Sequence, residues 1–168
     1  MGNIKDALPW YADGLRFECQ PNCGRCCHTG EVGPTLLGSD GEHDAEKLAK
    51  FFGWPLAQFI AEGTVASPYR YPNELGQVRC LPVINGTCVF LGDDDEGVAA
   101  RKCLVYESRP RQCRAYPWFD SHLATPETWA KAGLLCPGIG KCRVWSFEEI
   151  EAARATVHWE FEAFTLGM

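Results

Sequence analysis

Four of the chain's ten cysteines fall within nine consecutive positions, in the segment Cys19-Gln-Pro-Asn-Cys-Gly-Arg-Cys-Cys. Pro21 and Gly24 disfavour a helix here, because proline lacks an amide donor and glycine is costly in a helix interior. A loop can turn its side chains toward one point, which a strand or helix with this spacing cannot do. Disulfides between thiols so close in sequence would be strained. The segment therefore predicts a loop whose thiolates hold a metal ion or an iron–sulfur cluster.

Composition and charge narrow the class of protein. The chain has 168 residues, of which 46% are apolar and 23% charged, so we expect one globular domain over 1–168. The formal net charge of −6 provides no basic surface for nucleic acid or anionic lipid, so neither is expected as a partner. The acidic run at 93–96 lacks the spacing of a calcium loop and is interpreted as a solvated loop.

Cysteine usage depends on the redox compartment. No apolar run approaches the roughly 20 residues that span a bilayer, and the N-terminal residues do not resemble a signal peptide. We therefore expect a cytoplasmic protein without a membrane partner. Thiols are kept reduced in that compartment, so ten cysteines favour metal binding over disulfide bonds.

Local patterns predict an α+β fold that is small, mostly helical and loop-rich, with a short β-hairpin, organised around the cysteine site. Helix periodicity and capping signals predict helices over 44–53, 55–62, 111–114, 126–134 and 147–164. Thr125 and the Ser146/Glu149 capping box mark the starts of the last two helices. The apolar stripe of the last helix, interpreted as core packing, consists of Ile150, Ala153, Val157 and Phe161.

A hairpin and several loops complete the expected fold. Asn85-Gly86 is a type I′ turn signal, which predicts paired strands over 77–83 and 87–91. This pairing places Cys80 on one strand and Cys88 on its partner. Irregular loops are expected at 28–41 and 69–76. Aromatic and apolar residues of the entry segment are expected to cover the cysteine loop: Trp10, Tyr11, Leu15 and Phe17.

The cysteines recur in four blocks along the chain. After the first block come Thr87-Cys-Val-Phe-Leu, then Cys103-Leu-Val-Tyr with Arg109-Pro-x-x-Cys-Arg-x-Tyr-Pro, and finally Cys136-Pro-Gly. This order resembles the cysteine-cluster (CxxCxxCC) family over roughly 17–140. That family is described as a zinc- or iron-chelating domain and is sometimes labelled as iron–sulfur oxidoreductases. The resemblance implies eight metal ligands: Cys19, Cys23, Cys26, Cys27, Cys88, Cys103, Cys113 and Cys136. Cys80 and Cys142 fall outside the blocks and are interpreted as ordinary buried small apolar residues.

The metal can be iron or zinc, because both accept four thiolates in tetrahedral arrangement. Structural zinc sites usually pair two compact cysteine knuckles, whereas here only the first block is compact and the later ligands arrive singly. We therefore favour a 4Fe-4S cluster with a redox or cluster-dependent enzymatic role, served by a redox partner protein or a small-molecule substrate. Eight cysteines allow one four-ligand site with spare thiols, two such sites, or a shared polynuclear site.

Other functions compete with this interpretation. A structural zinc module, with four cysteines around each ion, would serve protein interaction without catalysis. A metal enzyme with an open coordination position would need a further ligand, for which His28, Glu31 and Asp120 are candidates. The spacing at 19–26 also matches radical-SAM enzymes, but Arg25 replaces the usual aromatic residue and the chain is too short for a βα barrel. No Cys-x-x-Cys opens a helix after a strand, as a thioredoxin-like site requires.

Three arginines lie close to the cysteines in sequence. A thiolate site carries net negative charge, and burying it requires compensating hydrogen-bond donors. Arg25, Arg109 and Arg114 are the candidates for that cofactor-binding role, since each guanidinium offers five N–H donors. The alternatives are an anionic substrate or a surface carboxylate as the arginine partner.

Overall fold

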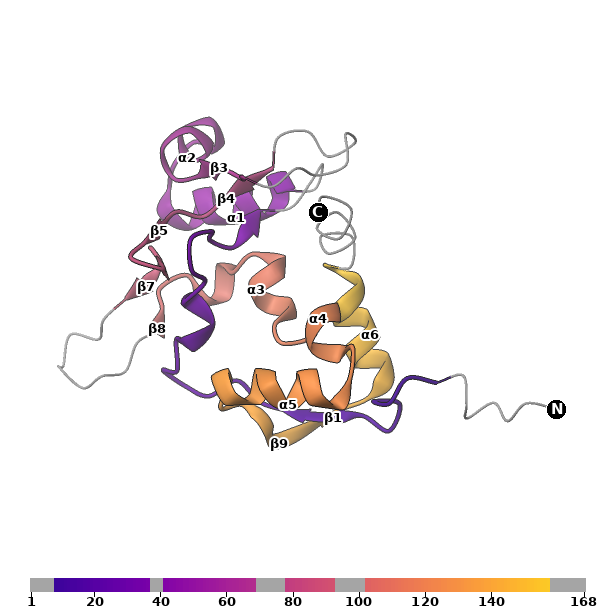
Figure 1. Cartoon of the computed structure of the whole chain (residues 1–168). Helices are drawn as coiled ribbons and strands as arrows, with labels where there is room; N and C mark the ends of the chain where they lie inside the picture. Colours follow the sequence, from indigo (N-terminus) through magenta and orange to yellow (C-terminus); the bar gives the residue numbers. More distant parts are fainter. Residues whose placement is uncertain (1–7, 37–40, 69–77, 93–101, 158–168) are drawn as a thin grey trace.

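A computed structural model describes residues 8–36, 41–68, 78–92 and 102–157 (Figure 1). The architecture is α+β, as expected, and consists of short helices and several small antiparallel sheets. The predicted loop at 69–76, the acidic run at 93–96 and residues beyond 157 lie outside the described residues. None of the described helices is long and apolar enough to cross a membrane.

The helices follow the predicted segments closely. Their bounds are α1 Gly41–Phe52, α2 Leu56–Glu62, α3 Arg111–Ala115, α4 Asp120–Leu123, α5 Pro126–Leu135 and α6 Phe147–Ala155, with 3-10 turns η2 Arg25–Cys27 and η4 Tyr106–Ser108. Gly53 ends α1 with a φ of 68°, as a left-handed C-terminal glycine does. The predicted extension of the last helix to residue 164 is not borne out within the described residues, because α6 ends at Ala155 and Thr156 caps it. The one-turn helix α4 was not predicted.

The described strands form four small sheets. In the first, β1 (Leu15–Phe17) pairs with β9 (Ile139–Trp145), and in the second β4 (Arg79–Cys80) lies between β2 (Thr35–Leu36) and β3 (Val65–Ala66). The remaining pairs are β5 (Val83–Ile84) with β6 (Thr87–Cys88) and β7 (Leu91–Gly92) with β8 (Lys102–Cys103). All pairings are antiparallel.

The Asn85-Gly86 hairpin is confirmed, but it is shorter than predicted. Both turn residues are left-handed, with φ of 50° and 77°, as a type I′ turn requires. The prediction that Cys80 lies on a strand paired with that of Cys88 is wrong, since β4 pairs with β2 and β3 while Val83 faces Cys88. Pro82 separates β4 from β5, because it has no amide proton to continue the ladder.

Two larger hydrophobic clusters and a small third one, made of Ala115 and Val157, form the core of the described residues. The first includes Leu48, Phe59 and Leu81, and the second is built around Trp118, which is fully buried. The rings of Phe17, Trp129 and Trp145 surround Trp118 with centroid distances of 5.6, 5.3 and 5.1 Å. Figure 1 shows α3 between α1 and α2 on one side and α5, β1 and β9 on the other. The segment that carries Cys113 is therefore held between the two clusters.

The entry segment belongs mainly to the second cluster. Tyr11 and Phe17 are buried there, and the indole N–H of Trp10 donates to the carbonyl of Leu123 at 2.8 Å. The expectation that this segment covers the cysteine loop is wrong for Trp10, Tyr11 and Leu15, because pairing with β9 places the segment against α5 and α6. Phe17 does line a pocket together with Cys19, Cys23 and Cys26 of the loop. The predicted stripe of α6 is confirmed as core for Ile150, Ala153 and Val157, and Phe161 lies outside the described residues.

The predicted capping box at the start of α6 leads to a test. The amide of Glu149 donates to the Ser146 hydroxyl at 3.3 Å, and the Ser146 amide donates to the Glu149 carboxylate at 2.9 Å. Ser146→Ala is expected to lower the free energy of unfolding by about 1 kcal/mol, because the first turn loses its acceptor. Ser121→Ala, at an exposed position of α4, is the control and should change it by less than about 0.5 kcal/mol. Equal losses in chemical denaturation would contradict the capping role.

Candidate metal centre

The cysteine-rich segment forms the predicted loop. Asn22 and Gly24 both adopt a φ of 58°, and these left-handed residues turn the backbone back on itself. The loop ends in the single 3-10 turn η2, whose Cys27 amide donates to the Gly24 carbonyl at 3.0 Å. Cys27 is buried whereas the adjacent Cys26 is exposed.

Backbone contacts bring the second and third blocks to this loop. The amides of Thr29 and Gly30 both donate to the carbonyl of Gly86, and His28 forms an isolated bridge with Thr87. The hairpin that carries Cys88 is therefore docked directly onto the loop. Pairing of β7 with β8 then places Cys103 opposite Leu91, a few residues after Cys88.

The remaining two cysteines are positioned by contacts with more distant parts of the chain. The amide of Arg111, the first residue of α3, donates to the Asp44 carboxylate at 3.1 Å, which fixes the helix of Cys113 against α1. At the other end the Glu18 amide donates to the Gly138 carbonyl at 3.1 Å. A Cβ atom at Gly138 would lie only 2.3 Å from the Glu18 carbonyl oxygen, so only glycine allows this approach. The Cys136-Pro-Gly block is thereby held next to the start of the cysteine loop.

Two adjoining pockets, here called the cysteine pockets, lie where these segments meet. The larger has a volume of about 1140 Å³ and is lined by seven of the eight predicted ligands: Cys19, Cys23, Cys26, Cys27, Cys88, Cys103 and Cys113. The smaller, of about 420 Å³, adds Cys136 and shares four of those cysteines with the larger pocket. All eight predicted ligands therefore line the cysteine pockets.

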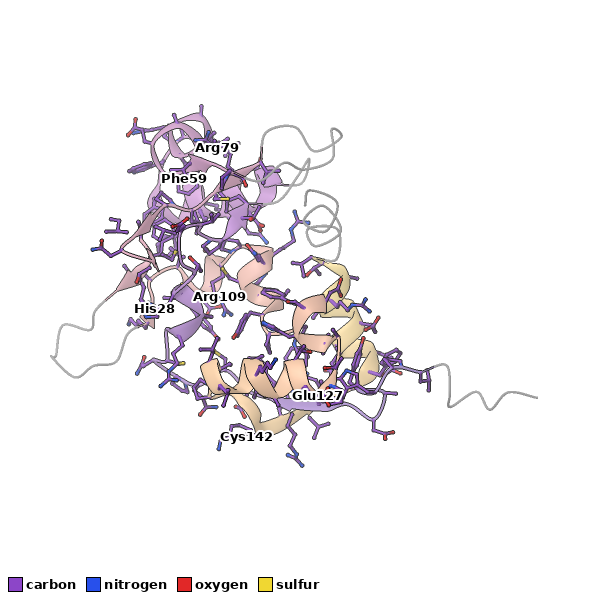
Figure 2. The ribbon with its side chains drawn as sticks, in the orientation of Figure 1. His28, Phe59, Arg79, Arg109, Glu127 and Cys142 are labelled. Carbon is purple, nitrogen blue, oxygen red and sulfur yellow. The ribbon has the colours of Figure 1, made fainter. Side chains whose placement is uncertain are left out.

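The other two cysteines lie elsewhere. Cys80 is fully buried on β4, with its sulfur 3.8 Å from the hydroxyl of Thr35, which agrees with an ordinary core residue. The interpretation of Cys142 as a buried residue is wrong, because it is exposed on β9, and Figure 2 shows it at the outer edge of the molecule, away from Arg109. All ten cysteines lie within the described residues, and none of them is joined in a disulfide. Within the described residues, no group of three or more His, Cys, Asp or Glu side chains is arranged to hold a single metal ion. Metal binding by the eight cysteines therefore stays a prediction.

Three thiols interact directly. Cys27 is in hydrogen-bond contact with both Cys103 and Cys26, and this contact raises the pKa of Cys27. Hydrogen bonding with Cys27 lowers the pKa of Cys26 to about 7 and that of Cys103 to about 7. Cys26 and Cys103 are therefore partly thiolate near neutral pH, which is the form that binds metal. The soft, all-sulfur donor set fits zinc or an iron–sulfur cluster.

Three other thiols have pKa values above the ordinary value, because they are buried. Burial raises the pKa of Cys88, Cys113 and Cys136, because a thiolate loses its hydration in a buried position. A bound cation compensates such a cost, so metal binding by these residues would release protons.

The three predicted arginines have different surroundings. The Arg109 guanidinium lies 3.6 Å from the centroid of the Tyr106 ring, and its positive charge lowers the pKa of Cys26 and Cys103. Arg25 is exposed on η2 and lines both cysteine pockets. Arg114 donates to the Arg109 carbonyl at 2.9 Å and pairs with Asp44 at 3.7 Å. Arg109 is thus the arginine whose charge acts on the thiols, and Arg114 supports its backbone.

The proposed non-cysteine ligands are only partly near the cysteines. His28 and Glu31 line the larger pocket, and Nδ1 of His28 lies 3.0 Å from the Thr87 hydroxyl. Asp120 lines neither cysteine pocket and instead pairs with Arg154 of α6. Of the three candidates, Asp120 is therefore the one that the structure does not place at the cysteine pockets.

One residue of the larger pocket was not predicted from the sequence. His122 lines the larger pocket, and its Nδ1 donates to the Pro117 carbonyl at 2.8 Å. No histidine spacing in the sequence indicated this position. Burial lowers the pKa of His122 from the ordinary value of 6.5, so the ring is neutral at pH 7.

The titration of His122 is a testable prediction. Since its pKa is lower in the folded than in the unfolded chain, the unfolded chain binds more protons, and stability is lost as pH falls below about 6.5. NMR of the His122 ring protons should give a midpoint below 6.5. His122→Phe should remove this contribution to the pH dependence of unfolding. A midpoint at or above 6.5 would refute the assignment.

Fold and pockets together define a cysteine-rich α+β domain whose thiols gather from distant segments around one region. The family model described as "CxxCxxCC: Putative zinc- or iron-chelating domain" matches residues 18–137, and the chain belongs to that family. It therefore carries a cysteine-cluster domain of the zinc- or iron-chelating type.

Among curated proteins, the chain is 29% identical over 118 residues to the Uncharacterized protein MJ0661 of Methanocaldococcus jannaschii. The alignment covers 70% of this chain and 53% of that protein, so the chain spans about half the length of the relative. No solved structure matches the chain.

Proposed function

We propose that this chain holds a 4Fe-4S cluster on cysteines of the cysteine pockets and has a redox or cluster-dependent enzymatic role. One observation carries the proposal: the eight cysteines of the four blocks line the two adjoining pockets, while Cys80 and Cys142 line neither. As an iron–sulfur oxidoreductase, the protein would act with a redox partner protein or on a small-molecule substrate. A reducing cytoplasm would maintain its cysteines as thiols, the form in which they occur here.

The distribution of the sulfurs supports a cluster over a single ion. They are spread over the walls of a pocket of about 1140 Å³ and do not surround one ion-sized point among the described residues. A cluster reaches such separated thiolates, since each ligand binds a different iron atom. Its net negative charge would be offset by Arg109, whose field already favours the thiolate forms of Cys26 and Cys103.

A structural zinc site is the second candidate, and a specific contact favours it. The thiol of Cys27 contacts those of Cys26 and Cys103, and the charges of Cys26 and Cys103 act on the pKa of Cys88. These four cysteines would supply the thiolates of one tetrahedral zinc ion if binding drew their sulfurs together around it. Such a module would stabilise the fold and serve protein interaction, and removing its metal would unfold the chain.

Metal analysis of protein purified without oxygen separates the two candidates. A cluster predicts iron and acid-labile sulfide in equal amounts, together with the broad visible absorption of sulfur-to-iron charge transfer. Zinc predicts a colourless protein in which neither iron nor sulfide is found. Colourless, zinc-loaded protein obtained under strict exclusion of oxygen would end the iron–sulfur proposal.

A further inference from the structure

One part of the larger cysteine pocket is built from rings instead of thiols. We call it the aromatic chamber and define it by Tyr116, Phe119, His122 and Leu135, all of which line that pocket. The rings of Phe119 and His122 stack with centroids 5.4 Å apart, and Tyr116 meets both of them edge-on at 5.6 and 5.5 Å. These mutual contacts hold the three rings in fixed orientations, so the chamber is a preformed apolar surface.

A single hydrogen-bond acceptor lies within this apolar surface. Because Nδ1 of His122 donates to the Pro117 carbonyl, Nε2 of the neutral ring carries a lone pair. Nε2 has no hydrogen-bond partner among the described residues. The described polar side-chain atoms that are both buried and without a partner belong to Thr29, Asp44 and Trp118, so Nε2 of His122 is accessible. The Tyr116 hydroxyl is already engaged, since it is in hydrogen-bond contact with the thiol of Cys136. Nε2 is thus the accessible polar atom of the chamber.

The chemistry of the chamber selects a class of ligand. Flat apolar molecules pack well against aromatic rings. A hydrogen bond to the one unpartnered acceptor favours ligands that carry an O–H or N–H donor. An anion would find no donor in the chamber, because Nε2 offers only a lone pair. The pocket volume of about 1140 Å³ is ample for a small ligand in addition to the thiol-lined region.

We propose that the aromatic chamber binds small, neutral, planar molecules of the phenol type, whose hydroxyl donates to Nε2 of His122. The inference rests on the proposed function only in that the same pocket would hold the metal, and it applies equally to iron- and zinc-loaded protein. The bound molecule would lie beside the thiols, in the position of a substrate or an electron-transfer ligand.

The first test uses the metal-loaded wild-type protein, labelled with ¹⁵N-histidine and titrated with phenol or toluene. The two probes have similar size and shape, and only phenol has a hydroxyl donor. Phenol is expected to shift the Nε2 resonance of His122 in a saturable way, and toluene is expected to leave it nearly unchanged. Equal responses to both probes, or no saturable response to either, would overturn the proposal.

The second test compares affinities in two matched variants, His122→Phe and His28→Phe. The ratio of the toluene to the phenol dissociation constant should fall about five- to tenfold in His122→Phe, the value of one hydrogen bond. The ratio should stay unchanged in His28→Phe, which removes the other histidine of the same pocket. An unchanged ratio in His122→Phe, or an equal fall in His28→Phe, would overturn the proposal. Iron, sulfide and zinc assays on the same samples test the cluster separately, so the two proposals can fail independently.

Discussion

Cys113→Ser is expected to abolish metal retention, whereas Cys142→Ser should bind as much metal per chain as the wild type. Cys113 lines both cysteine pockets, on a helix that lies between the two hydrophobic clusters. Burial raises the pKa of Cys113 and so disfavours its thiolate. A direct bond between the sulfur and a metal ion would offset this cost. Metal affinity should therefore fall by more than about 100-fold, beyond the roughly 10- to 100-fold effect of removing an indirect neighbour. Cys142 is exposed on β9 and lines neither pocket.

Iron, acid-labile sulfide and zinc per chain, measured on proteins purified side by side without oxygen, would check this. A third variant, Cys80→Ala, separates metal binding from folding, because Cys80 is fully buried but lies outside the pockets. It should lose stability without losing metal from the folded fraction. Metal retention by Cys113→Ser, or an equal loss in Cys142→Ser, would remove Cys113 from the set of ligands.

Local signals were the part of the fold that could be predicted. The Thr125 cap, the Ser146 capping box and the Asn85-Gly86 turn depend on residues adjacent in sequence, and each occurs in the structure. The pairing of β1 with β9 joins segments more than 120 residues apart, and it depends on packing that no local pattern encodes. The helix α4 is a single turn, too short for periodicity to reveal.

The candidate site shows the same division. Cysteine spacing and the family blocks predicted eight ligands and left out Cys80 and Cys142. The same eight cysteines line the cysteine pockets, and Cys80 and Cys142 line neither pocket. The contact of Cys27 with Cys103, and the position of His122 in the pocket, depend on how distant segments pack. Such contacts are tertiary, so spacing along the chain carries no signal for them.

Asp44 is another residue whose role arises from packing. It is 1% exposed, in the first turns of α1, on the same helix face as the buried Leu48 four residues later. Its carboxylate accepts the Arg111 amide at 3.1 Å and lies 3.7 Å from the Arg114 guanidinium. Arg114 in turn donates to the carbonyl of Arg109. Asp44 thus links α1 to the helix of Cys113 and to the arginine that acts on the thiols.

Asp44→Ala is therefore expected to lower the free energy of unfolding by about 1–3 kcal/mol, because the amide of Arg111 loses its acceptor and the partly exposed guanidinium groups of Arg111 and Arg114 lose their carboxylate. Glu46→Ala is the matched control, since it removes an exposed acidic side chain two residues away, and exposed charge interactions contribute less than about 1 kcal/mol. Chemical denaturation of the metal-loaded variants gives both values.

The same pair of variants also tests whether stability and metal binding are linked through α3. If Asp44 holds Cys113 and Arg109 in place, the folded fraction of Asp44→Ala should retain less metal than that of Glu46→Ala at equal free metal. This loss would follow from displaced ligands, because Asp44 itself lines neither cysteine pocket. Equal stability of the two variants would contradict the anchoring role of Asp44, and lower stability with full metal retention would confine that role to folding.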